Sequence, residues 1–455
     1  MAGLLNKRKE SNSSLQILVV AYAFPPNAEV GGLRVARFCR YLPAWGISPV
    51  VLTVQEQLYE ECDDTLPKPS GLRVERTGIL PTPLDWYKRW KARWAPAADT
   101  VDSSTPAPAT QPRGFFRRHT LALLQVPDPY WGWYLPAVRT AERVIEREPI
   151  TAIFSTSPPW SCHLVARHLK KKYRLPWLAD FRDPWVCRSF REDLPSWRNR
   201  VDQWLEASCL RWADRVICNT DRLRETFLRL HPDLPRGKFV TLTNGFDDPV
   251  AERASVESKS TRRCFLHLGS LYHGRRIDTF CQVVGDLVNT GKIDANSFKI
   301  LFLGDTSPSI AAMAYQRSPE LMRRHCIEFR PRVSWKQAQQ ALWSADLLLL
   351  FFEDKLAVPA KFYEYLQTGK PIFAVAPEGA LTDVLQSTRS GVWADPRDST
   401  AIAAKFLEAL GRTARSPEEV QRRWSSQYHY RSLTAQLAGW VCELVARTPK
   451  EGPGP

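Results

Sequence analysis

Residues 16–54, QILVVAYAFPPNAEVGGLRVARFCRYLPAWGISPVVLTV, decide the fold. They begin with a short apolar run, residues 16–22, which is followed by a Pro-Pro pair and is typical of a buried parallel strand. A loop with a Gly-Gly pair leads into a helical pattern, and a second apolar run follows at residues 49–54. Three arginines lie opposite the apolar side of the helical pattern: Arg34, Arg37 and Arg40. A strand, a glycine-containing loop, a helix and a strand in this order predict the start of a doubly wound α/β domain.

The same alternation of apolar runs and helical patterns returns in two series along the chain. In the first series, further strands are predicted at residues 151–155, 177–181 and 215–219. In the second series, strands are predicted at residues 264–269, 298–304, 346–352, 371–375 and 391–394. Because each series has the pattern of a doubly wound sheet, we predict an α/β fold with two Rossmann-like domains that face a cleft.

Composition places the boundaries of these domains. The polar stretch at residues 247–263 predicts a linker, and residues 1–15 and 448–455 predict flexible tails. We therefore expect an N-terminal domain over residues 16–246 and a C-terminal domain over residues 264–430. Two further ranges complete the prediction: an irregular insertion at residues 56–125 of the N-terminal domain, and a C-terminal helix at residues 431–447 that packs back on that domain.

Overall composition narrows the function classes. A chain of 455 residues exceeds what one hydrophobic core supports, so two or more domains are expected. The formal net charge of +15 favours an anionic partner, such as nucleic acid, a phosphate-bearing substrate or a membrane face. The 10 cysteines show no CxxC pair and no metal-ligand spacing, so we expect reduced thiols and a cytoplasmic location.

Two glycine-rich loops follow predicted strand ends, where doubly wound sheets bind their ligands. Gly31 and Gly32 allow close approach of a ligand, and the helix that we expect to begin near Leu33 offers its N-terminus to phosphate. In LGSLYHGRR, a phosphate seat can form from two glycines and an arginine: Gly269, Gly274 and Arg275. The alternatives, a tight turn for the first loop and a solvated surface turn for the second, stay open.

A third strand-end loop leads into VPAKFYEYLQTGKP. Lys361 and Glu364 lie three residues apart at a predicted helix start, so both side chains point to one face. Lys361 can meet a phosphate there, and Glu364 can accept hydrogen bonds from vicinal hydroxyls such as those of a ribose. A plain ion pair between the two side chains is the alternative interpretation.

Polar side chains also follow two successive strands of the first series, in STSPPWSCH and LADFRDPW. Four of them are expected to face the cleft: His163, Asp180, Arg182 and Asp183. A single histidine on a helix is more often a packed residue than a catalytic one. The clustering after two neighbouring strands is the observation that favours a functional role.

In order and spacing, these motifs resemble the bacterial family-4 glycosyltransferases. The matching segments are ILVVAYAFPPNAEVGGLRVARF, STSPPWSCHLVARHL, PWLADFRDPW, TNGFD, LGSLYHGRR, VPAKFYEYLQTGKP and GVWADP, which together span most of the chain outside residues 56–125. The resemblance implies the GT-B architecture of two Rossmann-like domains. It also implies transfer of a sugar from a nucleotide-sugar donor with retention of the anomeric configuration.

The resemblance assigns the donor side residue by residue. Gly31 and Gly32 would line the diphosphate side of the cleft, Arg275 and Lys361 would hold the donor diphosphate, and Glu364 would bind the nucleotide ribose. Gly269 and Gly274 belong to the same donor loop as Arg275. The catalytic set is completed by a histidine that would lie near the donor sugar, His163.

The segment from Asp180 to Asp183, with Arg182, would face the acceptor. One position departs from the family pattern, because the first of its paired glutamates is replaced by Leu356. Such a transfer needs no metal or other cofactor, since the leaving diphosphate itself takes the acceptor proton. The protein then has to position the reactants and neutralise the charge of the leaving group.

Two functions of other classes stay open as alternatives to sugar transfer. A nucleotide-sugar epimerase shares the architecture and the diphosphate seat, and a degenerate, non-catalytic transferase can act as an assembly partner at a membrane. Nucleic-acid binding is not expected, because no helix-turn-helix, RNA-recognition or zinc motif accompanies the basic residues.

The irregular insertion carries three indoles at helical spacing in LDWYKRWKARW: Trp86, Trp90 and Trp94. Basic residues fill the positions between them, which suits a helix lying in a membrane interface, although the indoles can equally pack on the first domain. The sequence shows no apolar core of a signal peptide and no stretch of ~18 apolar residues that could span a bilayer. We therefore expect contact from the surface, at the inner face of the cell membrane. With the resemblance, this implies a glycan or lipid-linked sugar as acceptor, as in bacterial polysaccharide assembly.

Overall fold

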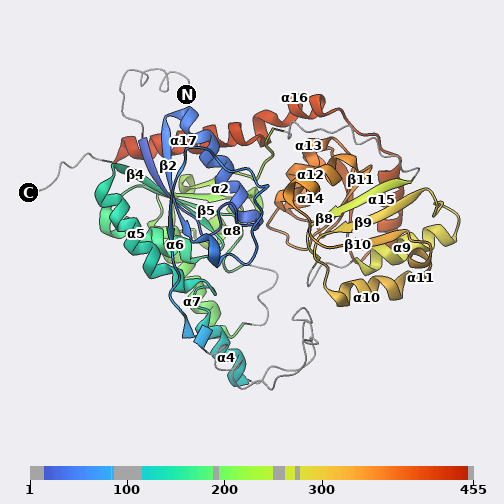
Figure 1. Cartoon of the computed structure of the whole chain (residues 1–455), viewed down its shortest axis with the longest axis horizontal. Helices are drawn as coiled ribbons and strands as arrows, with labels where there is room; N and C mark the ends of the chain where they lie inside the picture. The colour runs from blue at the N-terminus through green and yellow to red at the C-terminus, as the bar shows by residue number, and fades with distance from the viewer. Residues whose placement is uncertain are drawn as a thin grey trace, which may run out of the picture.

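The computed structural model describes residues 15–83, 85–86, 115–187, 194–248, 262–271 and 277–448, without the side chains of residues 30 and 115–118. Two α/β halves lie side by side, and the chain ends by returning to the first half along α16 and α17 (Figure 1). None of the described helices is long and apolar enough to cross a bilayer. All ten cysteines lie in the described part of the chain and are free thiols.

The N-terminal half is built on a seven-stranded parallel sheet with the order β3-β2-β1-β4-β5-β6-β7. Its strands are β1 (Leu15–Val20), β2 (Ile47–Val54), β3 (Arg73–Thr77), β4 (Ile150–Ser157), β5 (Trp177–Phe181), β6 (Arg215–Cys218) and β7 (Phe239–Thr241). The helices of this half are α2 (Val30–Tyr41), α4 (Phe115–Leu124), α5 (Tyr134–Arg147), α6 (Ser161–Tyr173), α7 (Ser196–Trp212) and α8 (Asp221–Leu230).

The C-terminal half is built on a six-stranded parallel sheet with the order β10-β9-β8-β11-β12-β13. Its strands are β8 (Arg263–Leu268), β9 (Phe298–Leu303), β10 (Ile327–Arg330), β11 (Leu347–Phe351), β12 (Ile372–Val375) and β13 (Gly391–Ala394). Its helices are α9 (Asp278–Asn289), α10 (Pro308–Arg317), α11 (Pro319–Arg323), α12 (Trp335–Ser344), α13 (Ala360–Thr368), α14 (Ala380–Thr388), α15 (Ser399–Leu410) and α16 (Pro417–Tyr428).

Side chains along each strand point alternately to the two faces of the sheet, and both faces are covered, so the central strands are apolar runs in the sequence. In β1, Leu18 and Val20 join one buried cluster while Ile17 and Val19 join a second cluster on the opposite face. Helices cover both faces of a parallel sheet, so most positions of a central strand are buried. The last helix, α17 (Tyr430–Arg447), adds its apolar side to the second of these clusters and packs against α2.

The predicted fold class, α/β with two Rossmann-like sheets, is confirmed, and every predicted strand lies within or beside an observed one. Three strands were not predicted: β3, β7 and β10. All three lie at edges of the sheets, where a strand is flanked on one side only and its sequence is more polar. Helix α2 begins at Val30, and the prediction of a start near Leu33 was wrong.

The three arginines of α2 differ in their exposure to solvent. Arg34 and Arg37 are buried, whereas the side chain of Arg40 is 50% exposed. Their charged groups reach partners on other elements, because α2 runs along the contact between the halves and beneath α17.

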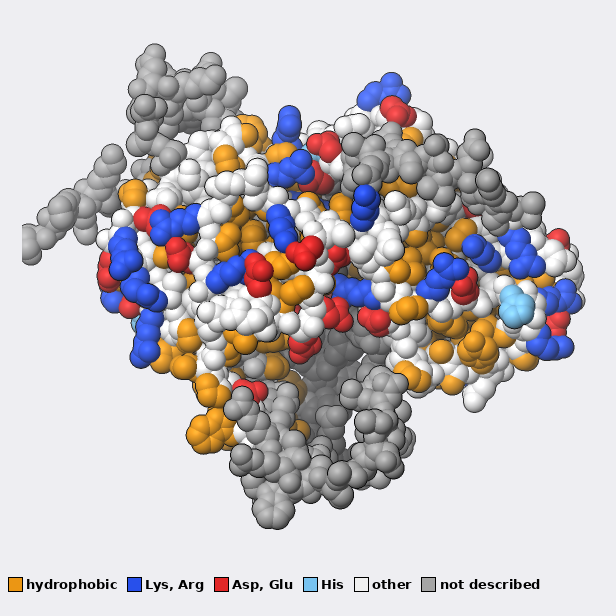
Figure 2. All heavy atoms as spheres, viewed as in Figure 1, with side chains coloured by type: hydrophobic (Ala, Val, Ile, Leu, Met, Phe, Trp, Pro, Cys, Tyr) orange, Lys and Arg blue, Asp and Glu red, His pale blue; other side chains and the backbone are white. Residues whose placement is uncertain are grey.

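On the face shown in Figure 2, described Lys and Arg side chains are scattered over both halves among Asp and Glu. The net charge of +15 is therefore not gathered there in one positive track of the kind that a nucleic-acid backbone needs.

The chain crosses between the halves twice, and the two crossings are hydrogen-bonded to each other. The N–H of Phe246 donates to the carbonyl of Tyr428 at 3.0 Å, and the N–H of Tyr430 donates to the carbonyl of Phe246 at 2.9 Å. Gly245 is required at this point, since a Cβ there would lie 2.1 Å from the carbonyl oxygen of Tyr428. We call this paired segment the hinge.

Candidate functional site

Loops that follow strand ends bring the two halves into contact. Arg332, which follows β10, donates hydrogen bonds to the carbonyl of Ala28 and to the carboxylate of Glu61. The N–H of Trp335 donates to Asp63 at 2.6 Å, so a carboxylate of the N-terminal half binds the start of α12. Because these residues follow the carboxyl ends of strands in both sheets, the ligand-binding edges of the sheets face each other.

A second set of contacts joins the segments that follow β6, β11 and β12, including the first turns of α8 and α14. The guanidinium of Arg222 binds both carboxylate oxygens of Asp383, at 2.5 and 2.8 Å. The hydroxyl of Thr220 donates to the carbonyl of Leu356. Leu356 stands where the resemblance expects a glutamate, and here it supplies a backbone contact between the halves.

The first glycine loop lies directly against a predicted acceptor-side residue. A Cβ on Gly31 would lie 2.0 Å from Nη1 of Arg182, so only glycine leaves room for this guanidinium at the start of α2. The Nε of Arg182 donates to the carbonyl of Ser157 at 3.0 Å. A Cβ on Gly32 would lie 3.2 Å from backbone atoms of Phe24, so the first turn of α2 packs closely on the segment that follows β1.

Two predicted donor-side segments meet in the C-terminal half. Gly269 follows β8 with φ +111°, and a Cβ there would lie 2.6 Å from Nζ of Lys361 on α13. The N–H of Leu268 donates to the hydroxyl of Tyr365 at 2.8 Å, which holds α13 against the end of β8. Gly274 and Arg275 lie outside the described residues.

Glu364 pairs with the opposite half of the molecule. Its Oε1 lies 3.1 Å from Nη2 of Arg37 on α2, and its Oε2 lies 3.5 Å from Nε2 of Gln339 on α12. Burial disfavours the charged form of Arg37, but Glu364, Tyr430 and Asp247 together outweigh it, so the pKa of Arg37 is raised. Sequence reasoning missed Arg37, because nothing in the local pattern connects positions 327 residues apart.

His163 is fully buried at the start of α6, and both of its ring nitrogens are engaged. Nδ1 lies 2.8 Å from Oγ of Ser155 and Nε2 lies 2.8 Å from Oγ of Ser157. Burial lowers the pKa of His163 to about 3, so the ring is neutral. Its catalytic role stays a prediction, and this geometry supports a structural role instead.

Asp180 is also fully buried, at the end of β5. Its oxygens accept hydrogen bonds from Arg34 at 2.8 and 3.0 Å and from the hydroxyl of Thr156 at 2.8 Å. Arg34 donates further to the carbonyl of Leu242 at 2.8 Å. The pair therefore joins α2, β5 and the segment leading to the hinge. Of the other two predicted acceptor-side residues, Arg182 lies at the start of α2, and Asp183 follows β5.

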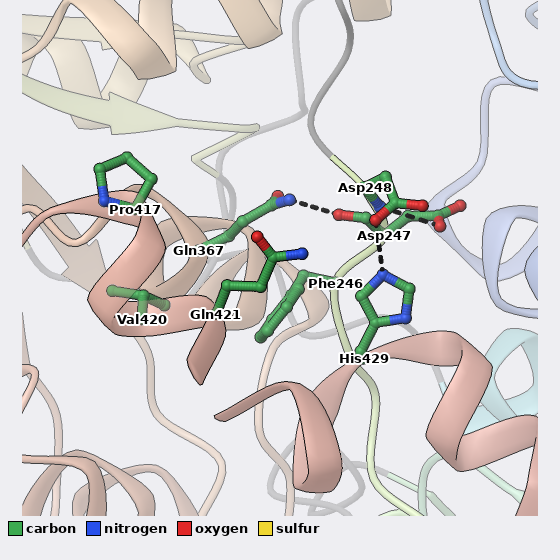
Figure 3. Close-up of a pocket in the computed structure, with 8 residues that line it drawn as sticks. All are labelled: Phe246, Asp247, Asp248, Gln367, Pro417, Val420, Gln421 and His429. Atoms are coloured by element: carbon green, nitrogen blue, oxygen red, sulfur yellow. Dashed lines mark hydrogen bonds and ion pairs between the residues drawn. The ribbon is translucent and has the colours of Figure 1, made fainter. Parts of the chain in front are cut away.

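Three potential metal ligands gather at the hinge: Asp247, Asp248 and His429, whose ligand atoms lie within 4.8 Å of one another. Figure 3 shows them beside Gln367, at one side of a small pocket. Asp247 already binds Arg40 and Tyr41, and Nδ1 of His429 accepts the N–H of Arg431. Nε2 of His429 lies 3.1 Å from Oδ1 of Asp248, so these atoms are paired within the protein and we assign the group to the hinge.

Comparison with protein families divides the chain at the same place as its structure. Residues 31–245 match the model of a glycosyl transferase 4-like domain, and residues 262–412 match that of the glycosyl transferases group 1. No curated protein matches the chain in sequence.

Solved structures resemble the whole molecule. Sucrose-phosphate synthase from Thermosynechococcus elongatus has a TM-score of 0.64 and 16% identity, covering 95% of this chain and 100% of that one. HepE of Anabaena, in complex with UDP and glucose, has a TM-score of 0.62 and 14% identity, covering 94% and 100%. WaaG, a glycosyltransferase involved in lipopolysaccharide biosynthesis, has a TM-score of 0.56 and 14% identity, covering 94% and 99%. At these identities the likeness shows the two-domain fold.

Proposed function

Since the chain belongs to the glycosyltransferases, with a domain of that class in each half, we propose that it transfers a sugar from a nucleoside-diphosphate sugar to an acceptor. In this proposal the C-terminal half binds the donor, the N-terminal half binds the acceptor, and the anomeric configuration is retained.

The meeting of Gly269, Lys361 and Glu364 at the facing edge of the C-terminal sheet is the observation that carries the proposal. A lysine ammonium and a carboxylate match two parts of such a donor: the cation suits the diphosphate and the carboxylate suits the ribose hydroxyls, while Gly269 leaves the room that the ammonium needs beside the end of β8. HepE, which shares this fold, has been solved with UDP and with UDP-glucose, and this supports a donor of the same kind.

The chemistry follows from charge. Breaking the bond between sugar and diphosphate leaves negative charge on the diphosphate, which Lys361 and Arg275 neutralise. The acceptor hydroxyl attacks from the same face, and its proton passes to a diphosphate oxygen, so the site needs neither a resident cofactor nor a side-chain base. Preorganised cations of this kind are among the largest contributions to catalysis.

An exposed apolar patch on the N-terminal half supports a membrane-bound acceptor. We define the patch by four side chains that are 40–67% exposed: Leu80, Trp86, Leu123 and Leu135. Hydrogen bonds hold their segments together, from Leu80 N–H to the carbonyl of Gly132 at 3.1 Å and from Trp131 Nε1 to the carbonyl of Leu124 at 2.9 Å. Helix α4 lies at one end of this half (Figure 1). Trp90 and Trp94 lie outside the described residues.

We propose that this patch seats the protein on the cytoplasmic face of the membrane, where it meets a lipid-linked glycan. Exposed aromatic and aliphatic side chains beside basic residues favour such an interface. Co-sedimentation with anionic liposomes tests this step, with Trp86, Trp90 and Trp94 all changed to Ser. The matched control is Tyr315→Ser, which removes an aromatic ring of 52% exposure from the C-terminal half. If the triple variant pellets as well as the control, the membrane step is wrong.

Transfer itself is tested with the purified chain and a panel of nucleotide sugars. A bound donor should raise the melting temperature, and slow donor hydrolysis without acceptor should follow. An epimerase would instead convert the donor to its epimer with no acceptor present. NMR of the transferred sugar reads the anomeric configuration directly, and an inverted product would refute retention. If no nucleotide sugar shifts the melting temperature or is consumed, the proposed function fails.

A further inference from the structure

The ion pair between Arg37 and Glu364 joins the halves at the proposed ribose-binding carboxylate. The Nη2–Oε1 distance is 3.1 Å, and the two side chains are only 7% and 15% exposed. An ion pair shielded from water in this way is strong in Coulomb terms, and breaking it leaves a charge in a poorly solvated place.

Arg37 depends on this partner. Its guanidinium carbon lies 5.1 Å from the centroid of the Tyr430 ring at the start of α17. Its Nε has no hydrogen-bond partner among the described residues, and within that part of the chain its charge forms an ion pair with Glu364 alone. If the halves separate, Glu364 moves away with α13 while Arg37 stays with α2 and α17. The pair therefore exists only in the closed arrangement.

The carboxylate of Glu364 can accept more hydrogen bonds than it receives from the protein. A carboxylate has about four acceptor positions on its two oxygens, and Arg37 and Gln339 use one each. The remaining positions suit the two adjacent hydroxyls of a ribose. A fixed carboxylate binds such a pair better than one that samples several rotamers, because less conformational entropy is lost on binding.

We propose that Arg37 is a positioning residue of the donor site, which orients Glu364 from the opposite half so that ribose recognition depends on closure. The inference rests on the proposed function. It makes donor binding and closure reciprocal: closing the halves strengthens donor binding, and bound donor stabilises the closed form by the same factor.

The main variant is Arg37→Met, which keeps an unbranched apolar stem against Tyr430 and removes the charge. We expect donor affinity to fall about 10- to 100-fold, the usual effect of losing a hydrogen bond between charged groups. Arg37→Lys keeps the charge and should restore part of the affinity. Arg222→Ala is the matched control, because it removes another ion pair between the halves, to Asp383, that is more exposed and does not involve Glu364. Its donor affinity should stay within a few-fold of wild type.

Two measurements are needed, both on the full chain. Isothermal titration with the nucleotide sugar that the panel identifies gives donor affinity. Small-angle scattering without donor gives the degree of closure, and Arg37→Met should be more open than wild type. Saturating donor should compact wild type, and compact the variant less.

The double variant Arg37→Met with Glu364→Gln separates positioning from general damage. If Arg37 acts through Glu364, its effect on donor affinity should largely vanish once Glu364 is already changed. Fully additive losses would overturn the proposal. So would unchanged scattering together with unchanged affinity in Arg37→Met, or tighter donor binding, which would make Arg37 a competitor of the ribose. If no nucleotide sugar binds wild type, the proposed function fails, yet the scattering without donor still tests the dependence of closure on Arg37.

Discussion

Replacing Gly269 by alanine tests the donor site with a single methyl group. The added Cβ would lie 2.6 Å from Nζ of Lys361, whereas an ordinary contact between such atoms is about 3.5 Å. Because Nζ ends a flexible side chain, it can retreat by about 1 Å at little cost in stability. A displacement of about 1 Å at a reacting group can lower turnover about 10²-fold.

Backbone strain has to be separated from this effect. Gly269 has φ +111°, where an alanine is strained by about 1–3 kcal/mol. Gly291, in the same half, has φ +72° and open space around a Cβ, so Gly291→Ala carries strain without crowding. Both variants should lower the free energy of unfolding, and only Gly269→Ala should also lower kcat/KM for transfer.

The assay is transfer at several donor concentrations, with denaturant unfolding of both variants at the same temperature. If Gly269→Ala keeps the kcat/KM of Gly291→Ala, Nζ of Lys361 has no part in the reaction, and the assignment of the diphosphate to this loop is refuted.

Three further predictions use other parts of the molecule. Lys361→Ala, and Arg275→Ala likewise, should each reduce turnover roughly 10²–10³-fold, and near-normal rates in both would exclude them as diphosphate ligands. Gly245→Ala should destabilise the protein by about 1–3 kcal/mol in denaturant unfolding, because its Cβ would meet the Tyr428 carbonyl at 2.1 Å; Gly439→Ala, with open space on α17, should not destabilise it. Because burial lowers the pKa of His163 to about 3, neutral His163 contributes stability above pH ~6.5 that is lost as pH falls toward 3. Unfolding free energies between pH 7 and 4 should therefore decline less steeply in His163→Asn, and equal slopes would contradict this.

The central strands could be predicted because burial on both faces leaves an unbroken apolar run in the sequence. Residues 177–181 and 391–394 match β5 and β13 at both ends. The edge strand β3, RVERT, has charged residues at three of its five positions and lies in a stretch that looked irregular. This segment forms a strand because it pairs with β2, and the pairing cannot be predicted from the local sequence.

One part of the candidate site could be predicted from the sequence and another part could not. Lys361 and Glu364 share a helix, so their spacing alone places them together. The contact of Glu364 with Arg37 is tertiary, and an arginine on a helix is ordinarily assigned to solvent. The structural role of His163 could have been predicted from the sequence. Ser155 and Ser157 lie two residues apart on β4, so both hydroxyls point to one face of the strand and bind the two ring nitrogens.

The return of α17 to the N-terminal half has a consequence for synthesis on the ribosome. Leu433, Leu437 and Val441 of this helix complete a cluster whose other members include Ile17 and Val19 of the first strand. The whole C-terminal half is translated between them, which takes roughly 10–40 s at ~5–20 residues per second. During that interval an apolar part of the first sheet has no cover from its own chain. The nascent protein is therefore a substrate for chaperones that shelter apolar surface, and a gene fragment that stops before residue 430 should yield an aggregating product.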